Sequence, residues 1–199
     1  MRACAGLCVL GAFAAAANAA PEDFVVDPGH TSPSFEVRHL GISTQRGRFE
    51  KTAGRIVLDR AAGTGTIEID IDTATLSTGN RLLDAQLKGE DFFDIGKFPA
   101  ITFRSTQVEV EKGELKRAQG SLTLLGVSHP VTLDVEHFAC TRLPFFVRLT
   151  CGADAVAHVS RSAFGMSRFA SFIADDVRIV IQVEAVKQEP AQEPSPAGG

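Results

Sequence analysis

Two histidines near the start of the chain are the residues best suited to polar chemistry with a small molecule. His30 and His39 lie on either side of a segment in which Phe35 and Val37 alternate with charged residues, and a histidine beside an apolar face can hydrogen-bond a carbonyl or pair with a phosphate. Arg48 follows, and its guanidinium can bind a phosphate group directly. The alternative is structural: a hydrogen-bonded histidine fixes a bend after the first strand, and the arginine pairs with a surface carboxylate.

Other site chemistries have little support in the sequence. His129, His137 and His158 are scattered, with no H-x-x-x-H or H-x-H pair and no carboxylate at ligand spacing. No G-x-S-x-G motif is present either. We therefore predict no metal, no cofactor and no catalytic residues.

The elements that position these side chains are predicted to be strands. Phe35, Val37 and His39 alternate with two charged residues, which is the period of a strand with one buried face. Gly41 and Gly47 allow sharp backbone changes, so we expect the strand to turn back on itself there. The segment predicts the start of a curved antiparallel sheet whose apolar inner face carries a histidine and lines a cavity.

Strand patterns dominate the rest of the chain, and the clearest is at 66–72, where isoleucines alternate with polar residues that are mostly acidic. Segment 78–88 instead places its leucines mainly on one helical face. With Thr78 or Asn80 as the cap and Gly89 as the stop, it predicts an amphipathic helix of about three turns. About eight or nine short strands at regular spacing predict an all-β barrel or sandwich. The predicted strands are Phe24–Asp27, Ser34–His39, Gly54–Asp59, Thr66–Asp72, Ala100–Val110, Leu115–Leu125, Val131–Cys140, Gly152–Ser160 and Asp176–Lys187.

Composition limits the partners. The 199 residues are 44% hydrophobic and 22% charged, which is typical of a globular protein with a substantial core. The net charge of −4 gives no basic footprint for nucleic acid or for anionic lipid surfaces. Trp and Tyr are absent, which weighs against sugar-binding and base-stacking sites.

Residues 1–19 are predicted to be a cleaved signal peptide. Arg2 provides a basic start, an uncharged apolar run follows, and Ala17-Asn18-Ala19 has the small-x-small form read by signal peptidase. A lipoprotein is the alternative because of Cys8, although the residues before it lack the usual lipobox order. Neither this run nor any later one is long enough for an integral membrane segment, so we expect a soluble periplasmic protein.

Cleavage leaves Cys140 and Cys151, which in an exported protein predict one disulfide bond. A catalytic thiol or metal pair is the alternative, but the spacing resembles no zinc or redox motif. We expect a single domain over 20–187, followed by a disordered tail over 188–199, which is rich in Pro, Gln and Glu.

Several segments, in order and from about Phe24 to Ala185, resemble the YceI-like family of secreted, lipocalin-like isoprenoid-binding proteins. The resemblance implies an eight-stranded antiparallel lipocalin-like barrel, closed by a short amphipathic helix, with an elongated apolar channel for a polyisoprenoid or isoprenoid quinone lipid. It implies no catalytic residues. The matching motifs are Asp27-Pro28-Gly29-His30-Thr31, Phe35-Glu36-Val37-Arg38-His39-Leu40-Gly41, Arg46-Gly47-Arg48-Phe49, Thr78-Gly79-Asn80, Asp91-Phe92-Phe93-Asp94, Lys97-Phe98-Pro99, Gly120-Ser121-Leu122-Thr123, Gly126-Val127-Ser128, Pro130-Val131 and Ser162-Ala163-Phe164-Gly165-Met166.

A prenyl chain gains roughly 0.8 kcal/mol for each buried methylene, so such a channel needs few polar contacts. Composition alone favours a solid core without a cavity, and the resemblance reverses that preference. The predicted ligand-binding residues are His30, Phe35, Val37, His39, Ile42, Arg48, Phe49, Phe92, Phe93, Ile101, Phe103 and Phe164.

The function predicted on this basis is a periplasmic carrier or buffer for an amphiphilic isoprenoid, without catalysis. Two alternatives stay open: a barrel enzyme acting on a small amphiphilic substrate, and a stress-response or adhesion module that binds another protein. The sequence also leaves open whether the chain is a monomer or a homodimer.

Overall fold

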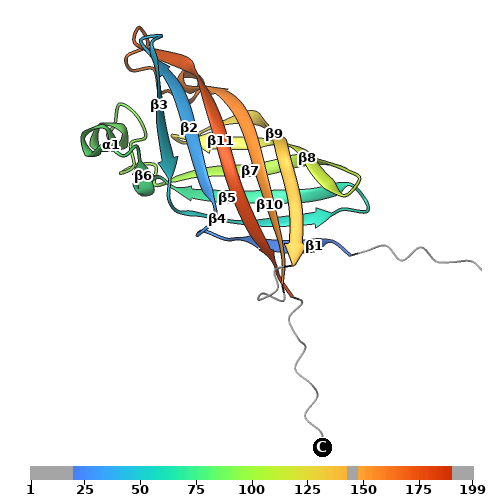
Figure 1. Cartoon of the computed structure of the whole chain (residues 1–199). Helices are drawn as coiled ribbons and strands as arrows, with labels where there is room; N and C mark the ends of the chain where they lie inside the picture. Colours follow the sequence, from blue (N-terminus) through green and yellow to red (C-terminus); the bar gives the residue numbers. More distant parts are fainter. Residues whose placement is uncertain (1–19, 143–147, 190–199) are drawn as a thin grey trace, which may run out of the picture.

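The computed structural model describes residues 20–142 and 148–189. Within these residues, eleven strands form one sheet, accompanied by one α-helix and two short 3-10 helices (Figure 1). In chain order the elements are β1 (Glu22–Val26), β2 (Ser32–His39), β3 (Ser43–Phe49), β4 (Thr52–Asp59), β5 (Thr64–Asp72), η1 (Thr73–Thr75), β6 (Leu76–Ser77), α1 (Arg81–Lys88), β7 (Ala100–Glu111), β8 (Glu114–Leu124), β9 (Val127–Arg142), β10 (Leu149–Ser160), η2 (Arg161–Phe164) and β11 (Ile173–Lys187).

The sheet closes on itself because β1 pairs with two neighbours. On one side it pairs with β4, and on the other with the C-terminal part of β11, where Val26 lies opposite Ala185. The closed ring β1–β4–β5–β7–β8–β9–β10–β11 therefore has eight strands, and every neighbouring pair is antiparallel. The prediction of an eight-stranded antiparallel lipocalin-like barrel with a short helix is confirmed.

The β2–β3 hairpin lengthens the barrel at one end. β2 lies along the same edge of β11 as β1 but further along it, with Ser32 opposite Gln182 and His39 opposite Ile173. β3 pairs with β2 and, through Phe49, with the short strand β6. Helix α1 lies at this same end of the molecule (Figure 1).

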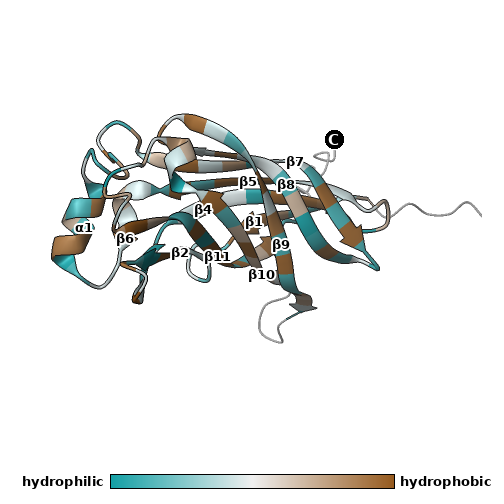
Figure 2. Cartoon of the chain, turned by 90° about the horizontal axis from the view of Figure 1, so that it is seen from above, coloured by the Kyte–Doolittle hydropathy of each residue, from teal (hydrophilic) through white to brown (hydrophobic). Residues whose placement is uncertain are grey.

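Alternating hydropathy decides which face of each strand turns inward. On β5, Ile67, Ile69 and Ile71 face the inside of the barrel, and the residues between them face solvent or the outer wall. The same alternation runs along the other strands, as the changing colours of the ribbons show (Figure 2). A one-residue slip in register would turn this apolar set outward, so the pattern fixes the register of the wall.

The turn between β2 and β3 uses one of the two predicted glycines. Leu40 and Gly41 both have positive φ, 54° and 71°, and the Ile42 N–H donates to the His39 carbonyl. The hairpin loop has three residues, because His39 pairs with Ser43. Gly47 was expected to make a turn, and this prediction is wrong. It lies within β3, opposite Phe35. The position requires glycine because a side chain there would collide with the Phe35 ring.

Helix α1 is shorter than the predicted segment 78–88. It begins after Asn80, whose side-chain oxygen accepts hydrogen bonds from the backbone N–H groups of Leu82 and Leu83. Gly79 has a φ of 78°, which is incompatible with a right-handed helix, so Thr78 lies outside it. Thr78 instead donates from its backbone and its hydroxyl to Asp84, at 2.7 Å each.

The predicted disulfide is confirmed. Cys140 on β9 lies directly opposite Cys151 on β10, and the two are bonded. The predicted signal peptide at 1–19 lies outside the described residues, as does most of the predicted tail, 190–199.

Candidate ligand-binding site

The barrel encloses a cavity of about 900 Å³. Its wall consists almost entirely of the inward apolar side chains of the strands, such as Ile69 of β5, Val135 of β9 and Ile179 of β11. The volume is within the range of pockets that hold small molecules, about 300–1,000 Å³. The interior is therefore hollow, in contrast to the solid core that composition alone favours.

One end of the cavity is closed. Phe24, Leu58 and Ala185 line it there, and their exposed fractions are only 1%, 2% and 3%. Phe24 and Ala185 pack with Cys151, so the disulfide lies at this closed floor.

The other end opens to solvent. Leu40 at the β2–β3 turn, Leu82 on α1 and Phe172 before β11 all line the cavity, yet they are 51%, 84% and 55% exposed. Side chains that border both the cavity and bulk water define a mouth. This mouth lies between the hairpin, α1 and the 165–172 loop.

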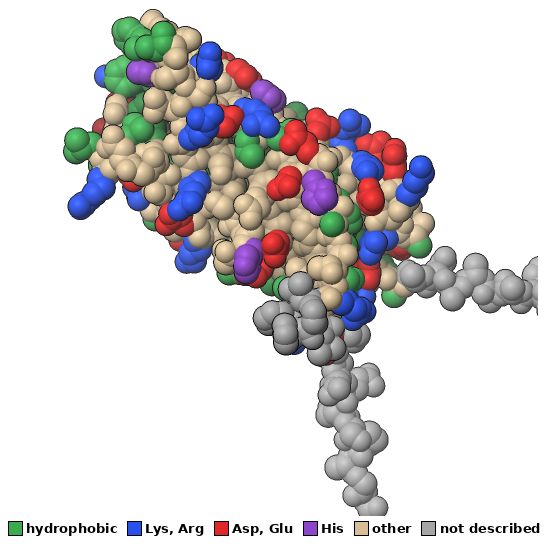
Figure 3. All heavy atoms as spheres, in the orientation of Figure 1, with side chains coloured by type: hydrophobic (Ala, Val, Ile, Leu, Met, Phe, Trp, Pro, Cys, Tyr) green, Lys and Arg blue, Asp and Glu red, His purple; other side chains and the backbone are tan. Residues whose placement is uncertain are grey.

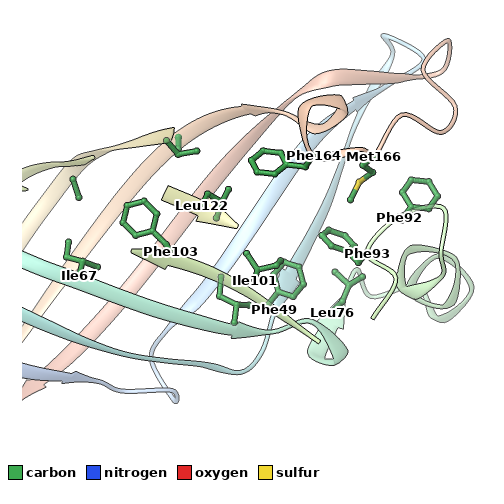
Figure 4. Close-up of a cluster of buried hydrophobic side chains, with 14 of the residues drawn as sticks. Phe49, Ile67, Leu76, Phe92, Phe93, Ile101, Phe103, Leu122, Phe164 and Met166 are labelled. Atoms are coloured by element: carbon green, nitrogen blue, oxygen red, sulfur yellow. The ribbon is translucent and has the colours of Figure 1, made fainter. Parts of the chain in front are cut away.

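An aromatic cluster narrows the interior near the mouth. The ring of Phe93 lies 5.4 Å from that of Phe49, edge to face, and 5.9 Å from that of Phe35. Figure 4 shows Phe49 and Phe93 beside Ile101 and Leu76. Phe35 fits because Gly47 lies opposite it and leaves room for its ring.

Few polar groups reach the cavity wall. His39 is half-buried at the mouth end of β2, and its imidazole forms no hydrogen bond within the part of the chain that the structure describes. Deeper in, Thr52 is 1% exposed, and its hydroxyl has no hydrogen-bond partner among the described residues. Its oxygen is shielded by neighbouring atoms, so of these two groups His39 is better placed to meet a ligand.

A buried arginine supports the mouth. Arg161 is 4% exposed, and its guanidinium donates to the carbonyl oxygens of Met166 (2.6 Å), Arg168 (2.9 Å), Ile173 (3.1 Å) and Ala174 (3.0 Å). These carbonyls lie on both sides of the exposed part of the 165–172 loop. The guanidinium therefore ties this loop to the barrel wall.

Most of the predicted ligand-binding residues border the cavity. Eight of the twelve do so, and they come from β2, β3, β7 and the loop after α1: Phe35, Val37, His39, Phe49, Phe92, Phe93, Ile101 and Phe103. Their contact with a ligand stays a prediction. The other four lie elsewhere, and none of them is brought into the cavity wall.

His30 lies on the outer surface in the β1–β2 loop. Its Nδ1 is hydrogen-bonded to Asp27 Oδ2 at 2.8 Å, which raises the pKa of the imidazole. The same bond, followed by the one from the Gly29 N–H, lowers the pKa of the Asp27 carboxyl. His30 is therefore a hydrogen-bonded histidine in a loop, as in the structural alternative to ligand binding.

The remaining three predicted residues also lie outside the cavity lining. Arg48 points outward on β3 and pairs with Glu50 at 3.1 Å. Ile42 is 81% exposed beside the hairpin turn. Phe164 is 2% exposed and packs edge to face against His129, with ring centroids 5.0 Å apart, so it belongs to the buried hydrophobic cluster.

The structure also bears on metal binding and on membrane-spanning helices. Among the described residues, no group of three or more His, Cys, Asp or Glu side chains could hold a metal ion. Within the same residues, no helix is long and apolar enough to cross a membrane.

Comparison with known proteins agrees with this architecture. Residues 24–185 match the YceI-like domain, a range that runs from within β1 to within β11 and so spans nearly the whole barrel. The chain belongs to the YceI-like family. A UPF0312 protein of Vibrio vulnificus is 36% identical over 144 residues, which are 70% of this chain and 75% of that protein.

Two solved structures share the YceI-like barrel. BcnA of Burkholderia cenocepacia superposes with a TM-score of 0.69 at 25% identity, covering 80% of this chain and 98% of BcnA. A polyisoprenoid binding domain from Saccharophagus degradans has a TM-score of 0.60 at 14% identity, covering 83% of this chain and 98% of that domain. The second likeness is one of fold.

Sequence reasoning missed part of the wall of this YceI-like barrel. The isoleucines of β5 and β11 were recognised as buried faces but were not named as site residues, although they line the cavity. Their strict alternation was a signal that could have identified them. Arg161 was also missed, and no local pattern marks it, because its partners are backbone carbonyls.

Proposed function

We propose that this YceI-like protein binds a long-chain isoprenoid lipid, of the quinone or prenyl-pyrophosphate class, and carries or buffers it without chemical change. The observation that carries this proposal is the apolar cavity of about 900 Å³, closed at one end and open at the other. A blind apolar tunnel suits a chain that enters tail first.

The energetics favour such a ligand. Each methylene that leaves water for the cavity contributes roughly 0.8 kcal/mol, and an isoprenoid chain supplies many of them. With the tail near Phe24 at the floor, the polar head would remain at the mouth, where His39 can hydrogen-bond a carbonyl or a phosphate oxygen. The apolar wall gives little selectivity along the chain, so the head group would decide which lipid is preferred.

Two further observations support the proposal. The polyisoprenoid binding domain of Saccharophagus degradans has the same fold. The Cys140–Cys151 disulfide is typical of proteins that fold in an oxidising compartment, so we place the protein in the periplasm or outside the cell.

The test is mass spectrometry of organic extracts from protein purified from its native source. We expect a long-chain isoprenoid in a molar amount close to that of the protein. Repeatedly empty extracts, from protein whose folding is verified by circular dichroism, would contradict the proposed function.

A further inference from the structure

Exposed apolar side chains gather around the cavity mouth. Of the seven large hydrophobic residues that are exposed in the described part of the chain, five lie here, and we call them the apolar rim: Leu40, Ile42, Leu82, Phe169 and Phe172. Hydrophobic side chains accordingly cluster at the end of the molecule that carries the hairpin (Figure 3, upper left).

Contacts join the parts of the rim. The Leu40 N–H donates to the Phe172 carbonyl at 2.7 Å, which fixes the hairpin turn against the 165–172 loop. Phe169 stacks on Phe92, with ring centroids 6.3 Å apart, which connects this loop to the segment after α1. These contacts join the hairpin, the 165–172 loop and the segment after α1 beside the opening. An apolar patch on a soluble protein marks an interaction surface.

Three arginines lie beside the rim. Arg38 precedes Leu40, Arg81 precedes Leu82, and Arg168 lies over the ring of Phe169 at 4.8 Å. The segments 38–44 and 165–173, which carry four of the five rim residues, contain arginine but no Asp or Glu. Arg168 lies 3.5 Å from Asp91 of the neighbouring segment, and Arg38 donates to the Thr44 hydroxyl.

We propose that the apolar rim docks on the surface of a lipid bilayer. The exposed apolar side chains enter the boundary between head groups and acyl chains, and the arginines lie at the level of the lipid phosphates. In this pose the cavity mouth faces the layer in which an isoprenoid dissolves, so the cargo enters without crossing water. The proposal rests on the proposed function only for the identity of the cargo.

The charges favour a bilayer over a second copy of the chain. A symmetric contact of the rim with itself would bring arginines of like sign together, which is unfavourable. Lipid phosphates instead provide the opposite charge over the whole surface.

The chain contains no Trp, so an introduced Trp is its sole such reporter. We would compare Ile42→Trp at the rim with Val25→Trp, an exposed position on β1 near the closed end. With vesicles of phosphatidylethanolamine and phosphatidylglycerol, we expect the emission of the Ile42→Trp variant to shift to the blue and to be quenched by brominated acyl chains. The emission of the Val25→Trp variant should not change. Unchanged emission at the rim, or a shift that depends on protein concentration without vesicles, would overturn the proposal.

Loss of binding provides the second measurement. The double variant Ile42→Ser/Leu82→Ser truncates two side chains that are more than 80% exposed, so its folding should be preserved. We expect its co-sedimentation with the same vesicles to fall at least roughly tenfold, whereas Val25→Ser should sediment like the unmodified protein. Vesicle binding equal to that of the unmodified protein would count against docking through the rim.

The two proposals fail separately, because vesicle binding is measured on the protein itself. Empty lipid extracts combined with rim insertion would contradict isoprenoid binding and still support docking. Protein loaded with isoprenoid that ignores vesicles would overturn docking alone.

Discussion

At the scale of single residues, a glycine within a strand determines where an aromatic ring lies in the cavity. A Cβ at Gly47 would lie 2.4 Å from Cζ of Phe35, far inside van der Waals contact. The missing side chain lets the Phe35 ring lie across β3 and join Phe49 and Phe93. Gly47 therefore positions the aromatic cluster near the mouth.

Gly47→Ala should destabilise the protein by about 1–3 kcal/mol, because the Phe35 ring must move into the cavity. The same displacement should weaken ligand binding. Gly96→Ala is the control, since a Cβ there has no neighbour within 4 Å, and its stability should stay within about 0.5 kcal/mol of the unmodified protein. Urea denaturation measures both, and equal midpoints for the two variants would refute the clash.

The His30–Asp27 pair predicts a local pH dependence. The raised pKa of His30 means that its stabilising contribution is complete below the ordinary value of about 6.5 and is lost as the pH rises through the folded pKa. The lowered pKa of Asp27 means that its contribution is present above its ordinary value of 3.8 and is lost as the pH falls through the folded pKa. The pair is therefore strongest between these two values.

Asp27→Asn should return the pKa of His30 towards its ordinary value, as followed by NMR titration of the imidazole. Asp176→Asn, which removes the carboxylate beside His158, is the matched control and should leave the titration of His30 unchanged. A His30 titration that is identical with and without the Asp27 carboxylate would show that the hydrogen bond does not form in solution.

At the scale of elements, the mouth is built from segments that have little regular structure. The 165–172 loop lies between η2 and β11, and many of its side chains are exposed. The loop has no backbone hydrogen-bond ladder of the kind that holds a strand. Four hydrogen bonds from the Arg161 guanidinium to backbone carbonyls hold it instead. Asp175 at the start of β11 holds the other side of η2: hydrogen bonds from the Ser160 hydroxyl and then the Ser162 N–H lower the pKa of its carboxyl.

Arg161→Lys should release the 165–172 loop, because an ammonium group cannot reach the four carbonyls in the same planar arrangement. We expect a loss of about 2–4 kcal/mol in stability and faster hydrogen exchange at Leu40, whose N–H donates into this loop. Arg48→Lys, at an exposed ion pair, is the control and should change little. Unaltered exchange at Leu40 would show that Arg161 does not hold the loop.

At the scale of the whole molecule, a closed sheet encloses more space than its side chains fill. The eight-stranded ring provides the wall, Phe24 and its neighbours close the floor, and the rim surrounds the opening. Small residues on β10, such as Ala153 and Ala155, leave part of the volume empty. Filling that volume is the direct way to test whether it holds a ligand.

Ala155→Phe places a ring inside the tunnel and should lower the binding of a long-chain isoprenoid roughly tenfold or more. Ala139→Phe adds the same ring to the exposed face of β9 and should bind normally. Lipid extracted per mole of protein measures the effect, and thermal melting verifies that both variants fold. Equal lipid content in the two variants would show that the ligand does not occupy this part of the barrel.

Most of the strands, their inward faces and the disulfide could be predicted from the sequence, whereas β3 and β6 were not among the predicted strands. The isoleucines of β5 and the apolar set of β11 repeat with the period of a strand, and this local property survives folding. The disulfide was predictable because cleavage of residues 1–19 would leave only Cys140 and Cys151 to pair. The motifs from Phe24 to Ala185 identified the family for the same reason, since each lies within one short segment.

Only the tertiary structure decided that the interior is hollow and which polar groups reach it. His30 and His39 are equivalent in the sequence, yet one lies on the outer surface with Asp27 and the other borders the cavity mouth. Gly47 acts by leaving room for the Phe35 ring, and Arg161 acts by donating to backbone carbonyls of the 165–172 loop and the start of β11. No sequence pattern near either residue predicts these contacts. The physical reason is that a cavity is volume left unfilled by side chains from the whole ring of strands, so no single segment encodes it.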